Sequence, residues 1–326
     1  MEPTFPLLRL PENAIVHVLE NMNLNQLLIF SLVSSKIKRL VTSLSIEAND
    51  VTIAIFSKIS IIVHTTKSHL TLNFYDDSNN QNEVLPVDIS LPVAASFNNE
   101  DRTIQSSTPF NLSDWLHHIQ LVLCCNQPLN IYFDLGCERF EIESLKEIIG
   151  SIRTLIPNSL LTNESSRNVL KCFNTPNKLY LFKNPFEDTS QIQQIFIKNY
   201  NGIVFRDVYS LDDMLLINSE EVNFYRPISQ KQFNRFVKHW IRGSNPRLQY
   251  MFLKIDKTDF VSREMLLKGI QCVDVGKEKQ QEICQNHGIG IVSYYMVAIR
   301  RKDGTPAVIA TKEFQNVIFI RFIVMY

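Results

Sequence analysis

Residues 220–255, EEVNFYRPISQKQFNRFVKHWIRGSNPRLQYMFLKI, decide the fold because they place one strongly patterned helix between two strand-like runs. Ser229 and Gln232 have the spacing of a capping box, which satisfies the first free N–H groups of a helix. Apolar residues then recur at helical spacing across residues 233–241, and Gly243 follows as a stop signal. The segment therefore predicts a strand-helix-strand unit.

The same alternation of strand and helix patterns recurs through the body of the chain. Candidate strands start at intervals of about 20 to 30 residues, which is typical of leucine-rich-repeat-like βα units. Strands joined by crossover helices run in the same direction, so a parallel sheet is expected. An open flavodoxin-like sheet is the rival, but no strand ends in the glycine-rich phosphate turn of that fold. The strands are expected to start near Ile131, Leu160, Leu179, Ile203, Val222 and Leu248.

Other segments carry the same helix-start pattern, a serine followed three residues later by an acidic or amide side chain. Each precedes apolar residues at helical spacing, which predicts helices between the strands. The pairs are Ser144 with Glu147, Ser190 with Gln193, and Ser210 with Asp213.

Both flanks of this region have β-strand patterns. Asp303-Gly304, between apolar runs, predicts a hairpin. The terminal sheet is expected to cover the end of the stack. Residues 97–107 are polar and predict a loop. The expected strands are residues 51–56, 59–64, 70–75 and 84–89 on one flank, and 291–300, 307–311 and 317–324 on the other.

The first residues predict three short helices. Apolar positions in residues 14–22 recur at helical spacing after Pro11, which suits a first turn because it lacks an N–H group. Asn25 is expected to cap a second helix, and residues 36–44 form a third. So small a module has excess apolar surface, which requires a partner or a neighbouring domain.

This pattern, ending in FSLVSSKIKRLV, closely resembles the F-box, in the variant of nematode F-box families. The resemblance implies binding to a Skp-type adaptor and, through it, to a cullin. Asn13 and Ile37 depart from the Glu and Trp that many F-boxes have there. The positions that match the motif, and are the candidate adaptor contacts, are Leu10, Pro11, Leu19, Leu27, Leu28, Val33 and Lys36.

Residues 213–255 resemble the type 2 F-box-associated region that accompanies nematode F-boxes. The resemblance implies a receptor that binds a target protein. It rests on Phe236, His239, Trp240, Gly243, Asn245, Pro246 and Leu248.

Target contacts are expected from loops or from the strand face of the stack, because extended surfaces are what such arrays offer. Arg206, Asp207 and Arg226 are polar residues beside expected strands and are the candidates. Solvated surface is the plainer interpretation of each.

These patterns predict a mixed α+β and α/β fold: a three-helix F-box, then a leucine-rich-repeat-like βα stack with β-rich flanking segments. The expected limits are residues 1–46 for the F-box, 47–112 for a β-rich connecting segment, 113–285 for the repeat-like region and 286–326 for the C-terminal hairpin or sheet.

Composition narrows the class of protein. Of the 326 residues, 45% are hydrophobic and 20% charged, so the chain can bury a core. Lys plus Arg equals Asp plus Glu at 33 each, which gives no overall attraction to nucleic acid or anionic membrane. The N-terminal residues lack the pattern of a secretory signal. We therefore expect an intracellular protein, cytoplasmic or nuclear, that binds neither nucleic acid nor membrane.

The sequence offers no catalytic or cofactor motif. Cys284 and His287 form a lone C-x-x-H without a second pair at zinc spacing, so no metal is expected. Gly288 and Gly290 lack the rest of a phosphate-binding fingerprint. His117 and His118 are expected on the solvated face of a helix. No cofactor and no catalytic residue is predicted.

Two alternatives to the receptor stay open. A protein-interaction module outside any ligase could use its helices to cap its own domain, with Leu10, Leu19 and Leu28 packed inside the chain. An enzyme would need a pocket where titratable groups converge with perturbed pKa values.

Overall fold

The computed structural model describes residues 9–66, 69–74, 93–97, 100–104, 110–125, 127–256, 263–289 and 295–325, with the backbone alone for 93–97 and 100–104. The chain forms two compact units, unit 1 (Met1–Pro176) and unit 2 (Asn177–Tyr326). N-terminal helices followed by mixed helix and strand structure confirm the predicted class at that level. The predicted domain limits stay a prediction.

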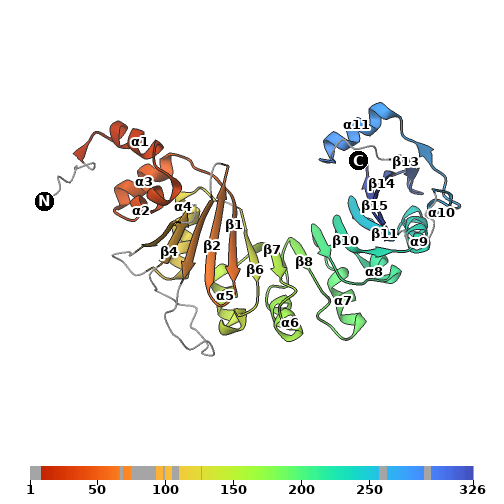
Figure 1. Ribbon diagram of the computed structural model, residues 1–326, viewed down its shortest axis with the longest axis horizontal. Coiled ribbons are helices and arrows are strands. Elements are labelled where there is room, and N and C mark those ends of the chain that lie inside the picture. The colour runs from red at the N-terminus through yellow and green to blue at the C-terminus, as the bar shows by residue number, and fades with distance from the viewer. Residues whose placement is uncertain are drawn as a thin grey trace. The chain divides into compact units, whose positions relative to one another are not determined.

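Three short helices open unit 1 (Figure 1). They are α1 (Glu12–Glu20), α2 (Leu24–Ser31) and α3 (Ser35–Ser43). Pro11 precedes α1, and the Ser34 hydroxyl caps α3. Asn23 and Gln26 form a capping box on α2, so the expected cap at Asn25 is wrong. Asn25 instead lies buried in the first turn of α2.

The sheet of unit 1 has the strand order β7-β6-β1-β2-β3-β4-β5. Its bounds are β1 (Ala48–Ile55), β2 (Ile59–Thr65), β3 (His69–Phe74), β4 (Val93–Phe97), β5 (Glu100–Ile104), β6 (Leu129–Phe133) and β7 (Ile152–Pro157). Strands β1 to β5 pair antiparallel in turn. Strands β1, β6 and β7 are parallel, which fits the predicted crossover helices.

Helices cover one face of this sheet. They are α4 (Leu112–Val122), the 3₁₀ helix η2 (Cys137–Arg139), α5 (Ile142–Ile149) and α6 (Asn163–Cys172). Trp115 of α4 is buried, with its ring edge-on to Phe74 of β3 at 6.4 Å. Phe173, just after α6, packs on Phe133 of β6 at 5.5 Å. These aromatic contacts place the core of unit 1 between the sheet and its helices.

Unit 2 has the strand order β12-β13-β14-β15-β11-β10-β9-β8. Its strands are β8 (Lys178–Leu181), β9 (Gly202–Phe205), β10 (Glu221–Ile228), β11 (Tyr250–Asp256), β12 (Val273–Asp274), β13 (Tyr295–Arg300), β14 (Pro306–Phe314) and β15 (Val317–Val324). Strands β8 to β11 are parallel, and β11, β15, β14 and β13 pair antiparallel in turn. The predicted terminal hairpin and its junction with the parallel strands are thus present.

Helices α7, α8, α9 and α10 belong to the parallel half of unit 2 (Figure 1). Their bounds are α7 (Thr189–Phe196), α8 (Leu211–Leu216), α9 (Gln230–Ile241) and α10 (Arg263–Leu266). Phe196 of α7 packs edge-on against Phe205 at 5.2 Å, and Trp240 of α9 against Phe322 at 4.9 Å. The aromatic core therefore lies between these helices and one face of the sheet.

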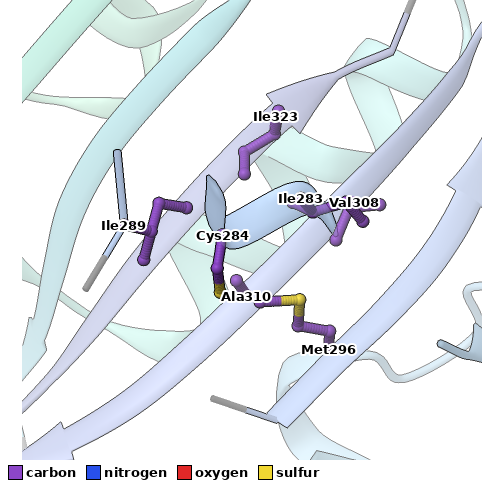
Figure 2. Close-up of a cluster of buried hydrophobic side chains, with 7 residues drawn as sticks. All are labelled: Ile283, Cys284, Ile289, Met296, Val308, Ala310 and Ile323. Carbon is purple, nitrogen blue, oxygen red and sulfur yellow. The ribbon is translucent and has the colours of Figure 1, made fainter. Parts of the chain in front are cut away.

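The last helix, α11 (Lys277–Asn286), packs on the terminal antiparallel strands. Figure 2 shows Ile283 and Cys284 of α11 close to Val308, Ala310 and Ile323 of the strands. Neighbouring side chains on a strand point to opposite faces. Because Phe322 contacts α9, Ile323 and α11 belong to the opposite face of the sheet.

Some predicted segments are wrong. Ile152 was counted with the apolar positions of the helix expected after Ser144, but it begins β7, because Gly150 has a positive φ of 73° and ends α5. Leu160 starts no strand and is 64% exposed. Residues 100–104, expected in a loop, form β5 at the sheet edge, where charged side chains are common. The expected strand at 84–89 lies outside the described residues.

Some of the predicted capping boxes are confirmed and others are wrong. Those at Ser210 with Asp213 and at Ser229 with Gln232 are confirmed. Ser144 lies inside α5 and caps nothing, and Asp188 replaces Ser190 as the cap of α7.

Candidate protein-interaction surfaces

The predicted adaptor contacts divide into buried and exposed residues. Leu19 and Leu28 are fully buried and Leu27 is 3% exposed, so they form the core of the helical module. The remaining candidates lie nearer the surface: Leu10 is half-buried, and Pro11, Val33 and Lys36 are exposed. Lys36 forms an ion pair with Glu12 at 3.4 Å.

The apolar side chains that the module exposes are Val18, Ile29 and Val33, at 36%, 37% and 57%. Val18 was counted among the apolar positions of the first helix and Ile29 was not singled out, so neither was predicted as a contact. Among the described residues, both side chains are left partly exposed.

The module also packs inward on α4. The Ser31 hydroxyl donates to the Leu28 carbonyl at 2.6 Å, and His118 Nε2 lies 2.7 Å from Ser31 Oγ. His118 is 3% exposed, so its expected place on a solvated face is wrong. Burial, together with the smaller effects of the charges of Lys38 and His117, lowers the pKa of His118 to about 4. A neutral imidazole that donates from Nε2 fits this contact.

The second candidate surface is the face of unit 2's sheet opposite α9. Leu253, Ile255 and Ile320 are buried, whereas alternate residues of β11 and β15 are partly exposed. Phe252 pairs with Arg321, and Lys254 with Phe319, across these antiparallel strands. We call the following set the cation–aromatic surface: Phe182, Arg206, Tyr225, Phe252, Lys254, Phe319 and Arg321.

Cations on this surface lie over aromatic rings. The Arg206 guanidinium is 4.6 Å from the ring centre of Phe182 and 4.8 Å from that of Tyr225. The Lys254 ammonium is 5.2 Å from Tyr225 and 5.6 Å from Phe319. Distances under about 6 Å give an attraction between a cation and a ring. The rings therefore fix both cations on the sheet.

The other two predicted target contacts have different surroundings. The Asp207 carboxylate accepts hydrogen bonds from the backbone N–H groups of Asn184 at 2.8 Å and Val208 at 2.7 Å. Arg226 is exposed, and its carbonyl accepts the Tyr209 hydroxyl at 3.1 Å. Asp207 thus fixes a turn beside Arg206, and the structure does not test target binding by any of the three.

A pocket of about 590 Å³ opens beside the cation–aromatic surface. Tyr250 lines this pocket, and its hydroxyl accepts a hydrogen bond from Arg321 of the surface at 3.1 Å. Glu221 in the pocket forms an ion pair with Lys178 at 2.8 Å. The lining is Glu221, Asn223, Gln249, Tyr250, Asn286, His287, Val324 and Met325.

In the described part of the chain, no three His, Cys, Asp or Glu side chains are grouped to hold a metal ion. No helix among the same residues has the length and apolarity to cross a bilayer.

The residues that carry the second sequence resemblance hold α9 in place. Phe236 and Trp240 are buried against Phe322. Asn245 follows α9 with a positive φ of 51°, which asparagine tolerates better than most residues. Its buried amide donates to the carbonyls of Met214 at 2.9 Å and Ile217 at 2.8 Å, which links the end of α9 to α8.

Comparison with known proteins supports both sequence resemblances independently. The family model described as F-box domain matches residues 7–49, and the one described as F-box associated matches residues 191–253. The chain is 24% identical over 309 residues to the F-box associated domain-containing protein sdz-33 of Caenorhabditis elegans. That alignment covers 93% of this chain and 92% of the relative. No solved structure matches. The chain therefore carries an F-box and a type 2 F-box-associated region, the arrangement of a nematode-type F-box protein.

Proposed function

We propose that this protein is the substrate-recognition subunit of a Skp-cullin-F-box ubiquitin ligase. The observation that carries the proposal is the F-box match over three helices that expose Val18, Ile29 and Val33. F-box domains typically bind a Skp-type adaptor and, through it, a cullin. An exposed apolar group on a small helical module fits such docking.

Target capture is assigned to the F-box-associated region. The parallel βα units of unit 2 act in this proposal as a leucine-rich-repeat-like array that presents a strand face to the target. The protein contributes no bond chemistry of its own. It raises the rate of ubiquitin transfer by holding a target near the charged enzyme, which is catalysis by proximity. The proposal places the protein inside the cell, where that machinery operates, and needs no cofactor, metal, nucleic acid or membrane.

The proposed adaptor interface has exposed residues that contact the adaptor and buried residues that support them. Val33 and Ile29 are proposed to contact the adaptor directly, with Leu10, Pro11 and Lys36 nearby. Leu19, Leu27 and Leu28 are proposed to support that surface from within, because they are buried in this chain. Replacing Leu19 or Leu28 would damage the module itself, so such variants cannot separate docking from folding.

The test is a pull-down of the purified chain with the Skp-type adaptors of its own organism. Ile29→Glu with Val33→Glu places two charges in the apolar contact, and we expect at least about a tenfold loss of adaptor affinity. Both side chains are exposed, so the free energy of unfolding should change by no more than about 0.5 kcal/mol per site. Leu160→Glu is the matched control, since Leu160 is 64% exposed elsewhere in unit 1.

The competing function is an interaction module whose helices cap their own domain outside any ligase. The contact of Ser31 with His118 favours it, because it shows the module packed on α4. Under that hypothesis the wild-type chain binds no adaptor, and the charged variant behaves as the control does. Either result overturns the ligase proposal. If the wild type binds the adaptor and only the double variant loses that binding, covering the chain's own domain cannot be the sole function of the helices.

A further inference from the structure

We propose that the cation–aromatic surface of unit 2 binds an acidic segment of the target protein, with Arg206 and Lys254 pairing to its Asp and Glu carboxylates. The inference rests on the proposed function, because it names the chemistry of the target that the F-box-associated region would hold. It differs from that function in making a specific claim about charge.

The first support is that both cations lack a polar partner. Among the residues that the structure describes, neither the Arg206 guanidinium nor the Lys254 ammonium forms a hydrogen bond or an ion pair. Asp207, the carboxylate next to Arg206 in sequence, already accepts two backbone N–H groups. A cation over a ring keeps its N–H groups available, so both residues can still donate to an incoming carboxylate.

The second support is pre-organisation. Tyr225 lies between the two cations, 4.8 Å from the Arg206 guanidinium and 5.2 Å from the Lys254 ammonium. The rings restrict these long side chains before any partner arrives, which lowers the entropy lost on binding. An exposed arginine or lysine without such support loses that entropy when it forms an ion pair.

The third support is the charge along the strands. Lys312 pairs with Phe319 across β14 and β15, and Phe319 pairs with Lys254 across β15 and β11. Arg206 and Arg321 add two further cations to this face, in a chain of zero net charge. The carboxylates described at its margins include Asp256 at the end of β11, Asp207 with its two backbone N–H donors, and Glu221, which is paired with Lys178. The local charge therefore complements an acidic partner.

A protein segment fits this surface better than a nucleic acid does. Single-stranded nucleic acid binds by stacking its bases on exposed aromatic faces. Here the side chains of Arg206 and Lys254 lie over the rings of Phe182, Tyr225 and Phe319. Cations held over the rings favour carboxylates at the surface over bases on the rings.

Helix α11 limits where the segment can lie. It covers the same sheet face farther along the strands, where Ile283 packs with Val308 and Ile323 (Figure 2). The pocket lined by Asn223 and Tyr250 lies beside the open part. An extended segment would thus cross the strands between Arg206 and Lys254, with room for one side chain in the pocket.

The test uses the full chain and a fluorescein-labelled oligoglutamate peptide, with binding followed by fluorescence anisotropy at low salt. Arg206→Gln with Lys254→Gln removes both charges and keeps most of the side-chain length. We expect about a threefold to tenfold weaker affinity, because each partly exposed pair contributes roughly 0.2 to 1 kcal/mol. The matched control is Lys231→Gln with Arg235→Gln, which removes two charges from exposed positions of α9.

Loss in the first variant and none in the control supports the proposal. No binding by the wild type, or equal binding by both variants, overturns it. Tighter binding of oligouridine of matched charge, dependent on Arg206 and Lys254, also overturns it and assigns the surface to nucleic acid.

Adaptor pull-down separates this inference from the proposed function. The Arg206 and Lys254 variant should retain the adaptor, because docking belongs to unit 1. A chain that binds oligoglutamate through these residues but binds no adaptor leaves the surface intact and overturns the ligase proposal alone.

Discussion

The sheets of units 1 and 2 differ in how the face opposite the helices satisfies its polar side chains. In unit 1, Asn130 donates to Asp50, Thr52 donates to Asp50 at 3.1 Å, and Asn158 donates to Asp134 at 2.9 Å. In unit 2, cations lie over rings and two of them have no described polar partner. A face whose polar groups bond one another needs no ligand, whereas the face of unit 2 retains donors for one.

The largest expected effect is on the free energy of unfolding, when a core tryptophan of one unit is removed. This variant tests whether units 1 and 2 are stable independently of each other. The sequence has two tryptophans, Trp115 in unit 1 and Trp240 in unit 2. Trp240→Ala should cost unit 2 about 3 to 5 kcal/mol, because the side chain is fully buried.

Trp115 is then the remaining tryptophan, and its fluorescence in a urea titration should show an unchanged transition for unit 1. Hydrogen exchange of the amides of β11 measures the loss in unit 2. The reciprocal Trp115→Ala variant is the matched control. A shared transition in both variants would mean that the units unfold together.

A smaller effect is expected from pH, through His118 in unit 1. Its pKa of about 4 lies below the ordinary 6.5, so the unfolded chain binds the proton more tightly than the folded chain. The free energy of unfolding should therefore fall by up to about 3 kcal/mol as pH drops from 6.5 to 4.

Urea titrations at several pH values, followed by Trp115 fluorescence in a Trp240→Phe background, check this slope. His118→Gln keeps a polar side chain beside Ser31 and should remove most of the pH dependence in that window. An identical slope in that variant would show that another group titrates.

The smallest effect addresses the two faces directly. Asp50→Ala removes the acceptor of Asn130 and Thr52 and should cost about 1 kcal/mol of stability. Lys254→Gln should change stability by less than about 0.5 kcal/mol, because among the described residues the partly exposed ammonium loses only its contacts with the rings of Tyr225 and Phe319. Chemical denaturation of both variants measures the difference. Equal losses of free energy of unfolding would mean that the polar groups on the face of unit 2 are satisfied within the chain as fully as those of unit 1.

Local chemistry predicted part of this fold. The boxes at Ser210 and Ser229 were predictable because side chain and backbone satisfy each other within three residues. β7 was missed because Ile148, Ile149 and Ile152 also fit a helical period, and only the conformation of Gly150 separates helix from strand. A single sequence does not reveal such a tertiary choice.

The candidate surfaces were less predictable than the fold. Alternation along β11 identifies two faces but not which one the helices cover, so Phe252 and Lys254 were not recognised. Arg206 was named only for its position beside a strand. Its contacts depend on Phe182, which follows β8, and on Tyr225 within β10, and these residues meet Arg206 only after folding.

The position of β15 has a consequence for how the protein is made. β15 lies between β14 and β11, although the ribosome synthesises it after both. The N-terminal helices are synthesised first and can fold early. One edge of β11 stays unpaired until residues 317–324 have been synthesised. A translation product that stops before residue 317 would lack the strand carrying Phe319 and Arg321. Under the proposed function, such a product would still dock on the adaptor and would occupy the ligase without delivering a target.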